Sequence, residues 1–246
     1  MKVPFPLLIL AAAAAVLAGS AHAATPLAAS MSIEAMTKIG DEVNFDKSTD
    51  AWGTVLVSLS VGAMAFSADP QNNSATAQGY GNAGWTGANA GAVSFEGYGW
   101  EWGVEVGSPQ IETTLNTAVP DWSYTFAAEA GDEQFRVEYN VFAGGATFGL
   151  QGWQILVTGG PEFEQSLDIR DVFDPTANGT FVADLTAGNE YTVTLLNNAN
   201  LSGPGHNMSG QMSGTFRWQI SPIPEPGSYA LMALGLLGVG AAARRR

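Results

Sequence analysis

Apolar residues recur at every second position in one segment of this chain after another, and no stretch between residues 51 and 221 keeps a 3.6-residue period. This alternation is typical of strands that bury one face, because successive side chains of a strand point to opposite sides of the sheet. It is clearest in residues 55–61, 122–126, 135–141, 153–157, 163–169 and 216–220. Glycine and asparagine between these segments supply turns. The pattern predicts an all-β domain, an antiparallel β-sandwich with a jelly-roll-like arrangement.

The most aromatic segment of the chain changes the parity of its apolar positions. These positions are odd up to Phe95 and even from Tyr98 onward. A strand that exchanges its faces needs an extra residue, so we expect a glycine-assisted β-bulge or a corner in residues 97–99. In that arrangement Trp100 and Trp102 belong to the core, on the same side as the valines that follow them.

Residues 69–91 are rich in glycine, alanine, asparagine and serine, which predicts a long loop. Residues 79–84 match G-x-G-x-x-G by letter, but a dinucleotide site needs a buried strand before that motif and a helix after it. Neither is expected here, so the match carries no function. Trp85 follows in the same segment. Trp85, Tyr98, Trp100 and Trp102 could together form a stacking platform for sugar rings, since aromatic faces bury the C–H surfaces of sugars. Because Trp100 and Trp102 are expected in the core, we take Trp85 as the better candidate for an exposed, sugar-binding ring.

Two further segments complete the expected fold. Residues 181–185 and 191–195 alternate on both sides of a compact turn with glycine and asparagine, which predicts a hairpin. The structure of residues 24–50 stays open, and within this segment residues 30–39 fit either a short helix or a strand.

The first 23 residues have the three parts of a secretory signal peptide. A lysine makes the start positive, residues 5–18 predict an apolar helix, and Ala21 and Ala23 frame an A-x-A cleavage site. The general secretion machinery is therefore expected to export the chain, with Ala24 as the first residue of the mature protein.

The other end of the chain has its own signal. Pro224 and Pro226, on either side of Glu225, interrupt any strand or helix. The uncharged apolar residues 229–243 predict a hydrophobic helix of roughly 22 Å, which is a marginal membrane anchor. The chain closes with three arginines, Arg244, Arg245 and Arg246. The positive-inside rule keeps this cluster in the cytoplasm and places the preceding body outside.

Pro-Glu-Pro, a short apolar helix and a terminal arginine cluster together resemble the PEP-CTERM sorting tail of Gram-negative bacteria. This tail is also labelled as an ice-binding protein C-terminal segment, which is not evidence of ice binding. The resemblance covers residues 224–246 and implies processing by an exosortase of the inner membrane. It further implies transient anchoring there, and then a place at the cell surface or in an extracellular matrix, in a setting of exopolysaccharide and biofilm.

The chain thus divides into a signal peptide (1–23), an N-terminal segment (24–50), a sandwich domain (51–221) and the sorting tail (222–246). The two ends hold four of the nine lysines and arginines and one of the 23 aspartates and glutamates. Five basic and 22 acidic residues remain, so the body has a net charge of −17. That charge repels nucleic acid and anionic lipid. Cysteine is absent, so burial of apolar surface rather than disulfides must stabilise the domain.

Few residues of the sequence are candidates for metal binding or catalysis. Asp168, Asp171 and Asp174 recur every three residues, and carboxylates of this kind bind Ca²⁺ outside the cell. His206 is the only histidine of the sequence after the signal peptide, too few for a catalytic zinc site. A glycosidase needs two neighbouring carboxylates. Two candidate pairs are expected to be solvated strand residues instead, namely Glu101 with Glu105 and Glu162 with Glu164.

We therefore expect an exported, exosortase-processed surface or matrix protein whose β-sandwich is not an enzyme and needs no cofactor. A carbohydrate- or Ca²⁺-binding module is the alternative, and a secreted carbohydrate-active enzyme is the third interpretation. A close carboxylate pair in a groove would favour the enzyme. An exposed aromatic strip without such a pair would favour the binding module.

The signal peptide generates the first testable prediction. The protein recovered from surface and medium fractions should begin at Ala24, because the A-x-A motif ends at Ala23. Intact-mass and N-terminal peptide analysis measure this directly. Recovery of a chain that still carries Met1 outside the cytoplasm would contradict it.

Overall fold

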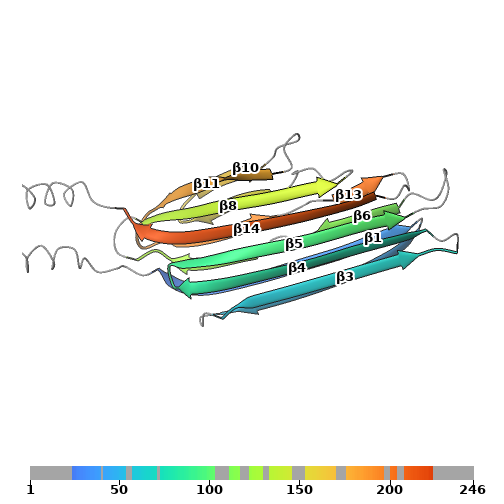
Figure 1. The fold of residues 1–246 in the computed structure, drawn as a ribbon. Coiled ribbons are helices and arrows are strands. Elements are labelled where there is room, and N and C mark those ends of the chain that lie inside the picture. Colours follow the sequence, from blue (N-terminus) through green and yellow to red (C-terminus); the bar gives the residue numbers. More distant parts are fainter. Residues whose placement is uncertain are drawn as a thin grey trace, which may run out of the picture.

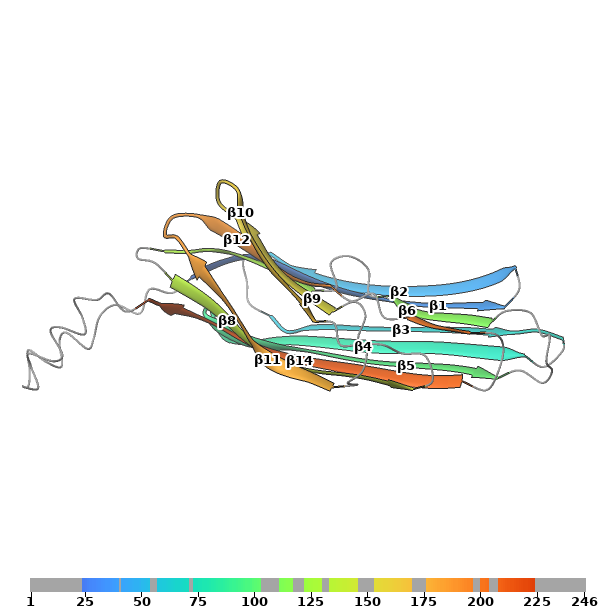
Figure 2. The ribbon, with the colours of Figure 1, turned by 90° about the horizontal axis from the view of Figure 1, so that it is seen from above.

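The computed structural model describes residues 24–39, 41–53, 57–70, 73–102, 111–116, 122–129, 133–145, 153–169, 176–196, 200–203 and 208–223. Every regular element within these ranges is a β-strand. The strands form two antiparallel sheets that pack as a sandwich (Figures 1 and 2), which confirms the predicted fold class. The helices predicted at the two ends lie outside the described residues. A helix able to cross a membrane is not found in the ranges given above.

Each sheet draws strands from distant parts of the chain. The first, called here the eight-stranded sheet, has the order β10 (Phe163–Ile169), β9 (Trp153–Gly159), β12 (Glu190–Leu196), β7 (Trp122–Ala127), β1 (Thr25–Ile39), β6 (Ile111–Asn116) and β13 (Asn200–Gly203), and β2 (Glu42–Trp52) also pairs with β1. The second, the six-stranded sheet, has the order β11 (Thr176–Leu185), β8 (Glu133–Gly145), β14 (Met208–Pro222), β5 (Ala90–Trp102), β4 (Ser74–Gly87) and β3 (Leu59–Ala68).

The N-terminal segment, left open by the sequence, is strand. β1 and β2 pair antiparallel from Ala29 to Ile39, and β1 also pairs with β6 and β7. Met31, Ile33 and Ala35 of β1 are fully buried, so the period of two decides the structure here as well. The sandwich therefore begins at Thr25.

Both ends of the described chain lie at one end of the sandwich, called here the proximal end (Figures 1 and 2). Asn89, in the turn between β4 and β5, links the two ends of the described chain by hydrogen bonds. The backbone N–H of Ala24 donates to Asn89 Oδ1 over 2.7 Å, and the N–H of Ile220 donates to the Asn89 carbonyl over 2.7 Å. The distal end, opposite, holds the ends of β1 and β5.

Large aromatic rings fill the space between the sheets toward the proximal end. Tyr124 lies among them, with its ring centroid 4.9 Å from that of Trp218 and 5.4 Å from that of Phe126. Its hydroxyl donates to the Ala88 carbonyl over 3.0 Å, and burial raises the pKa of the phenol. The other fully buried rings are Trp122, Trp153, Tyr191, Phe95, Phe135 and Phe216.

Small residues replace these rings toward the distal end. Here the inward positions of β3 and β4 include alanines that are buried almost completely, namely Ala63, Ala65, Ala75 and Ala77. Cα atoms of β1 come repeatedly within 8 Å of those of β3 and β4. That is closer than the about 10 Å usual between packed sheets. The hydroxyls of Thr37 and Ser67 bridge the two sheets directly at 2.7 Å. The sandwich is thus thin at its distal end.

This taper explains why the prediction of a bulge or a corner in residues 97–99 is wrong. β5 pairs with β4 and β14 in an unbroken register through these residues, so the strand never changes faces. Instead, the large side chains move from the inner face to the outer face while glycines take the inner positions. Trp100 and Trp102 therefore lie on the outer surface, where Trp102 is 37% exposed, and not in the core as predicted.

Two other predictions from the sequence are wrong. Residues 69–91 do not form a loop, because most of them build β4 and the start of β5. Their small inward-facing side chains fit into the narrow space between the two sheets. Residues 181–185 and 191–195 do not form a hairpin either, because β11 pairs in the six-stranded sheet and β12 in the eight-stranded one. Gly188, with φ of 80°, turns the chain from one sheet to the other.

Acidic side chains of β2 close one lateral edge of the sandwich. Asp46 Oδ2 accepts a hydrogen bond from the Met64 N–H over 2.9 Å, and Asp50 Oδ2 accepts one from the Ser60 N–H over 3.1 Å. Both N–H groups belong to β3, the edge strand of the six-stranded sheet. Exposed edges invite pairing with other chains, and inward-pointing charges are a known protection against it.

Close packing around Gly91 generates the second prediction. A Cβ atom at position 91 would lie 2.6 Å from the Gly84 carbonyl oxygen and 2.7 Å from a ring carbon of Trp218. Gly91→Ala should therefore lower the free energy of unfolding by about 1–3 kcal/mol, the usual cost of overpacking. Urea denaturation measures the change. Gly87→Ala, in the same hairpin, meets no atom within 4 Å and should stay within about 0.5 kcal/mol of the wild type. Equal stability of the two variants would contradict the packing described here.

Candidate functional site

The outer surface of the six-stranded sheet carries a group of large aromatic side chains toward its distal end. We call this group the aromatic face, and it consists of Phe66 on β3, Tyr80 on β4, and Tyr98, Trp100 and Trp102 on β5. Trp100 is half-buried, and the other four are between 37% and 55% exposed. Large aromatic side chains gathered on the surface of a soluble domain mark an interaction site.

Polar side chains alternate with these rings from strand to strand. Tyr98 lies directly between Gln78 on β4 and Gln211 on β14 in the strand register. Two residues before Tyr98 on β5, and on the same face, Glu96 lies between Tyr80 on β4 and Ser213 on β14. Neighbouring strands are about 4.8 Å apart, so each ring has an amide, a hydroxyl or a carboxylate within reach of one bound group.

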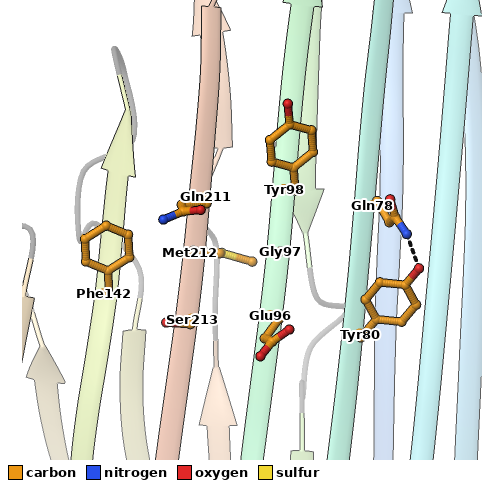
Figure 3. A pocket seen from close by; sticks show the side chains of 9 residues that line it. All are labelled: Gln78, Tyr80, Glu96, Gly97, Tyr98, Phe142, Gln211, Met212 and Ser213. Atoms are coloured by element: carbon orange, nitrogen blue, oxygen red, sulfur yellow. Dashed lines mark hydrogen bonds between the residues drawn. The ribbon is translucent and has the colours of Figure 1, made fainter.

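Tyr80 lies flat on the sheet because the residue beside it has no side chain. A Cβ atom on Gly62, its partner on β3, would come within 3.1 Å of the Tyr80 ring. The Gln78 amide donates to the Tyr80 hydroxyl and helps to hold the ring in place (Figure 3). The tyrosine thereby presents a ring face to solvent.

These side chains surround a shallow depression of about 390 Å³. Figure 3 shows Tyr80, Tyr98 and Phe142, the last from β8, spread over one side of the sheet around Glu96. A second depression of about 560 Å³ lies on the side toward β11. The two depressions adjoin, since Ser213 lines the first and Thr215, two residues further along β14, lines the second. Its described lining is mostly polar and includes Glu138, Asn140, Asn178, Thr180, Thr215 and Arg217, together with Tyr139.

Rings beside amides and hydroxyls can do two things for a ligand. The ring faces bury apolar C–H surface, and the amide and hydroxyl groups both donate and accept hydrogen bonds. This combination suits a molecule that is apolar on its faces and rich in hydroxyls at its rim. A sugar ring has that chemistry.

The predicted sugar-binding residue Trp85 lies elsewhere. It is half-buried and packs against the core, with ring centroids 5.2 Å from Trp52, 5.9 Å from Tyr124 and 6.5 Å from Trp122. The expectation that this ring is exposed is therefore wrong, because the supposed loop is a strand that covers the core. Tyr98 and Trp102 take the exposed position instead.

The other predicted residues are only partly described. Asp168 is exposed on β10 and accepts a hydrogen bond from the Gln154 amide over 2.7 Å, whereas Asp171 and Asp174 lie outside the described residues. Among the described side chains no group of three acids or histidines could hold a metal ion. Glu162 and Glu164 are exposed near the turn between β9 and β10, away from both depressions.

The predicted cleavage and sorting residues and the remaining candidates fall mostly beyond the described chain. Ala24, the predicted first residue of the mature protein, is described and is 1% exposed. Outside the described residues lie Ala21, Ala23, Pro224, Glu225, Pro226, Arg244, Arg245, Arg246, His206 and Glu105.

Sequence reasoning missed the polar members of the site, namely Gln78, Glu96 and Gln211, and with them the rings of Phe66 and Tyr80. The signal was present in residues 74–83, where small residues at odd positions alternate with polar and aromatic residues at even positions. Glycine and alanine usually indicate a loop, whereas here they occupy the inner face of a strand.

Comparison with known protein families locates one motif. The model of the PEP-CTERM protein-sorting motif matches residues 222–246, which confirms the resemblance inferred from the proline pair and the arginine cluster. The motif directs an exported protein to an exosortase, with transient anchoring in the membrane before it reaches the cell surface. It begins at Pro222, the last residue of β14.

Comparison with curated proteins finds no match. Among solved structures, a chain from the cryo-EM structure of Mud Crab Dicistrovirus is 16% identical, with 39% of this chain and 49% of that chain covered and a TM-score of 0.18. A two-domain structure of Extended-Synaptotagmin 2 is 8% identical, with 83% of this chain and 93% of that chain covered and a TM-score of 0.17. This chain spans about half the length of the dicistrovirus chain.

The positions of two tryptophans generate the third prediction. Trp102→Phe should remove much of the tryptophan emission that acrylamide quenches, because Trp102 is exposed on the outer face. Trp85→Phe should remove less of it, since Trp85 packs against the core. Stern–Volmer slopes of the two variants and the wild type measure the difference. A larger loss of quenchable emission in Trp85→Phe than in Trp102→Phe would contradict the positions described here for the two side chains.

Proposed function

We propose that this exported protein, which carries a PEP-CTERM sorting motif and is targeted to an exosortase, binds a polysaccharide through its aromatic face. The observation that supports the proposal most is the alternation of exposed rings with amides across β4, β5 and β14. The proposed ligand is an exopolysaccharide of the biofilm matrix around a Gram-negative cell, which is the setting that the sorting motif suggests.

The form of the site favours a polymer over a small molecule. Small-molecule pockets are usually concave and enclose most of their ligand. Both depressions here are shallow, and they adjoin on the surface of one sheet, from Tyr80 to Thr180. A chain of sugars can lie along such a surface and leave it at both ends.

The polar lining also distinguishes a glycan from a second copy of this chain. The fully buried centre of a protein–protein interface is depleted in charged residues. Here Glu96 lies in the first depression, between Tyr80 of the aromatic face and Ser213. A carboxylate in this place is readily satisfied by the hydroxyls of a sugar.

We propose further that the sandwich binds its glycan without cleaving it and without a cofactor. Glycosidases use two carboxylates on opposite sides of the bond they break. Of the described residues that line the first depression, Glu96 is the only acid, and Glu138, which lines the second depression, is paired with Arg136. Stacking and hydrogen bonding require no metal, so the binding should survive a chelator.

Removal of one ring tests the proposal and is the fourth prediction. Tyr98→Ala should weaken binding about tenfold or more, because a ring that stacks on a sugar contributes on the order of 1.5–3 kcal/mol when its apolar surface is buried. The measurement is affinity electrophoresis and calorimetry with cellulose, xylan, chitin and mannan oligosaccharides and with the exopolysaccharide of the producing bacterium.

Phe45→Ala is the matched control. Phe45 is an equally exposed ring, 57% accessible, on β2 of the other sheet, and its removal should leave the affinity unchanged. Equal losses in both variants, or no binding of any of these glycans by the wild type, would contradict the proposal. Concentration-dependent dimerisation that Tyr98→Ala abolishes would assign the face to a second copy of the chain instead.

A further inference from the structure

We infer that Glu96 makes the aromatic face selective for amino sugars that carry a free, positively charged amine. The inference rests on the proposed function and narrows it to one class of polysaccharide. It concerns the carboxylate at the centre of the first depression, which stacking alone does not require.

The surroundings of Glu96 leave its charge available to a ligand. The side chain is exposed on β5, in the depression between Tyr80 and Tyr98 (Figure 3). The described part of the chain holds two ion pairs, Lys47 with Glu34 and Arg136 with Glu138, and neither involves Glu96. Arg217 lies four residues from Ser213 on β14, which is about 13 Å along the strand.

An ammonium group fits this place better than a hydroxyl or an acetamide. A carboxylate accepts shorter and stronger hydrogen bonds from a charged donor than from a neutral one. The faces of Tyr80 and Tyr98 add attraction for a cation within about 6 Å of a ring centroid. A hydroxyl gains neither contribution, and an acetamide carries no charge.

The net charge of the whole domain also favours a positively charged glycan. A body with a net charge of −17 attracts a polycation and repels polymers rich in carboxylate, sulfate or phosphate. Long-range attraction raises the rate of encounter with a cationic glycan but does not choose a site on the surface. Glu96 supplies the site, since it places one carboxylate among rings that stack on the sugar.

Three oligosaccharides of one length and one linkage test the inference as the fifth prediction. They are β-1,4-linked hexamers of glucose, N-acetylglucosamine and glucosamine, which differ only in the group at the second ring carbon. Calorimetry with the full secreted protein should show glucosamine bound at least about fivefold tighter than glucose, and more salt should reduce this preference. Glu96→Gln should bring the ratio of the two affinities close to one and leave the glucose hexamer bound as before.

Glu164→Gln is the control for bulk charge. It removes the same charge from an exposed strand residue of the other sheet and should keep the preference for glucosamine. Loss of that preference in both variants, or its survival in Glu96→Gln, would overturn the inference. If the inference fails in this way but Tyr98→Ala still weakens binding of the glucose hexamer, the proposed polysaccharide binding stands. If Tyr98→Ala has no effect on that binding, both the proposed function and the inference are contradicted.

Discussion

The distance between the two sheets decides where the large side chains of this protein can go. Toward the proximal end the sheets are far enough apart for Trp122, Trp153 and Tyr124 to pack between them. Toward the distal end the alanines of β3 and β4 let the backbones approach, and no space for a ring remains. Rings at the distal positions must therefore face outward, and the aromatic face is the result. One property, the size of the inward residues, thus positions both the core and the site.

The thin distal end needs support that hydrophobic burial cannot supply, because alanine removes little apolar surface from water. Hydrogen bonds between the sheets provide part of it. Thr37 meets Ser67 inside the sandwich, and Asn44 also donates to Ser67 over 2.9 Å. Asp46 and Asp50 close the edge beside β3. The acidic residues of β2 therefore serve the fold as well as the solubility of the domain.

Alternation predicted the fold class and most strands because it depends on local geometry alone. It could not predict which sheet a strand joins, as β11 and β12 show, since pairing depends on distant partners. It failed for residues 74–102 for a different reason. The usual rule places large residues inside, and here the spacing of the sheets reverses that rule. The rule therefore assigns Trp100 and Trp102 to the wrong face, and it gives no reason to consider Glu96 at all.

The shared position of the two ends has a consequence for the protein while its tail is still in the membrane. Ala24 and Ile220 both hydrogen-bond to Asn89, and the sorting motif starts at Pro222. A tether at this end leaves the opposite end free to extend outward. Glu96 lies six residues beyond Ala90 on β5, about 20 Å from the turn, and Trp102 lies about 40 Å from it. The aromatic face, through which we propose that the protein binds a polysaccharide, thus lies away from the end of the sandwich at which the sorting motif begins.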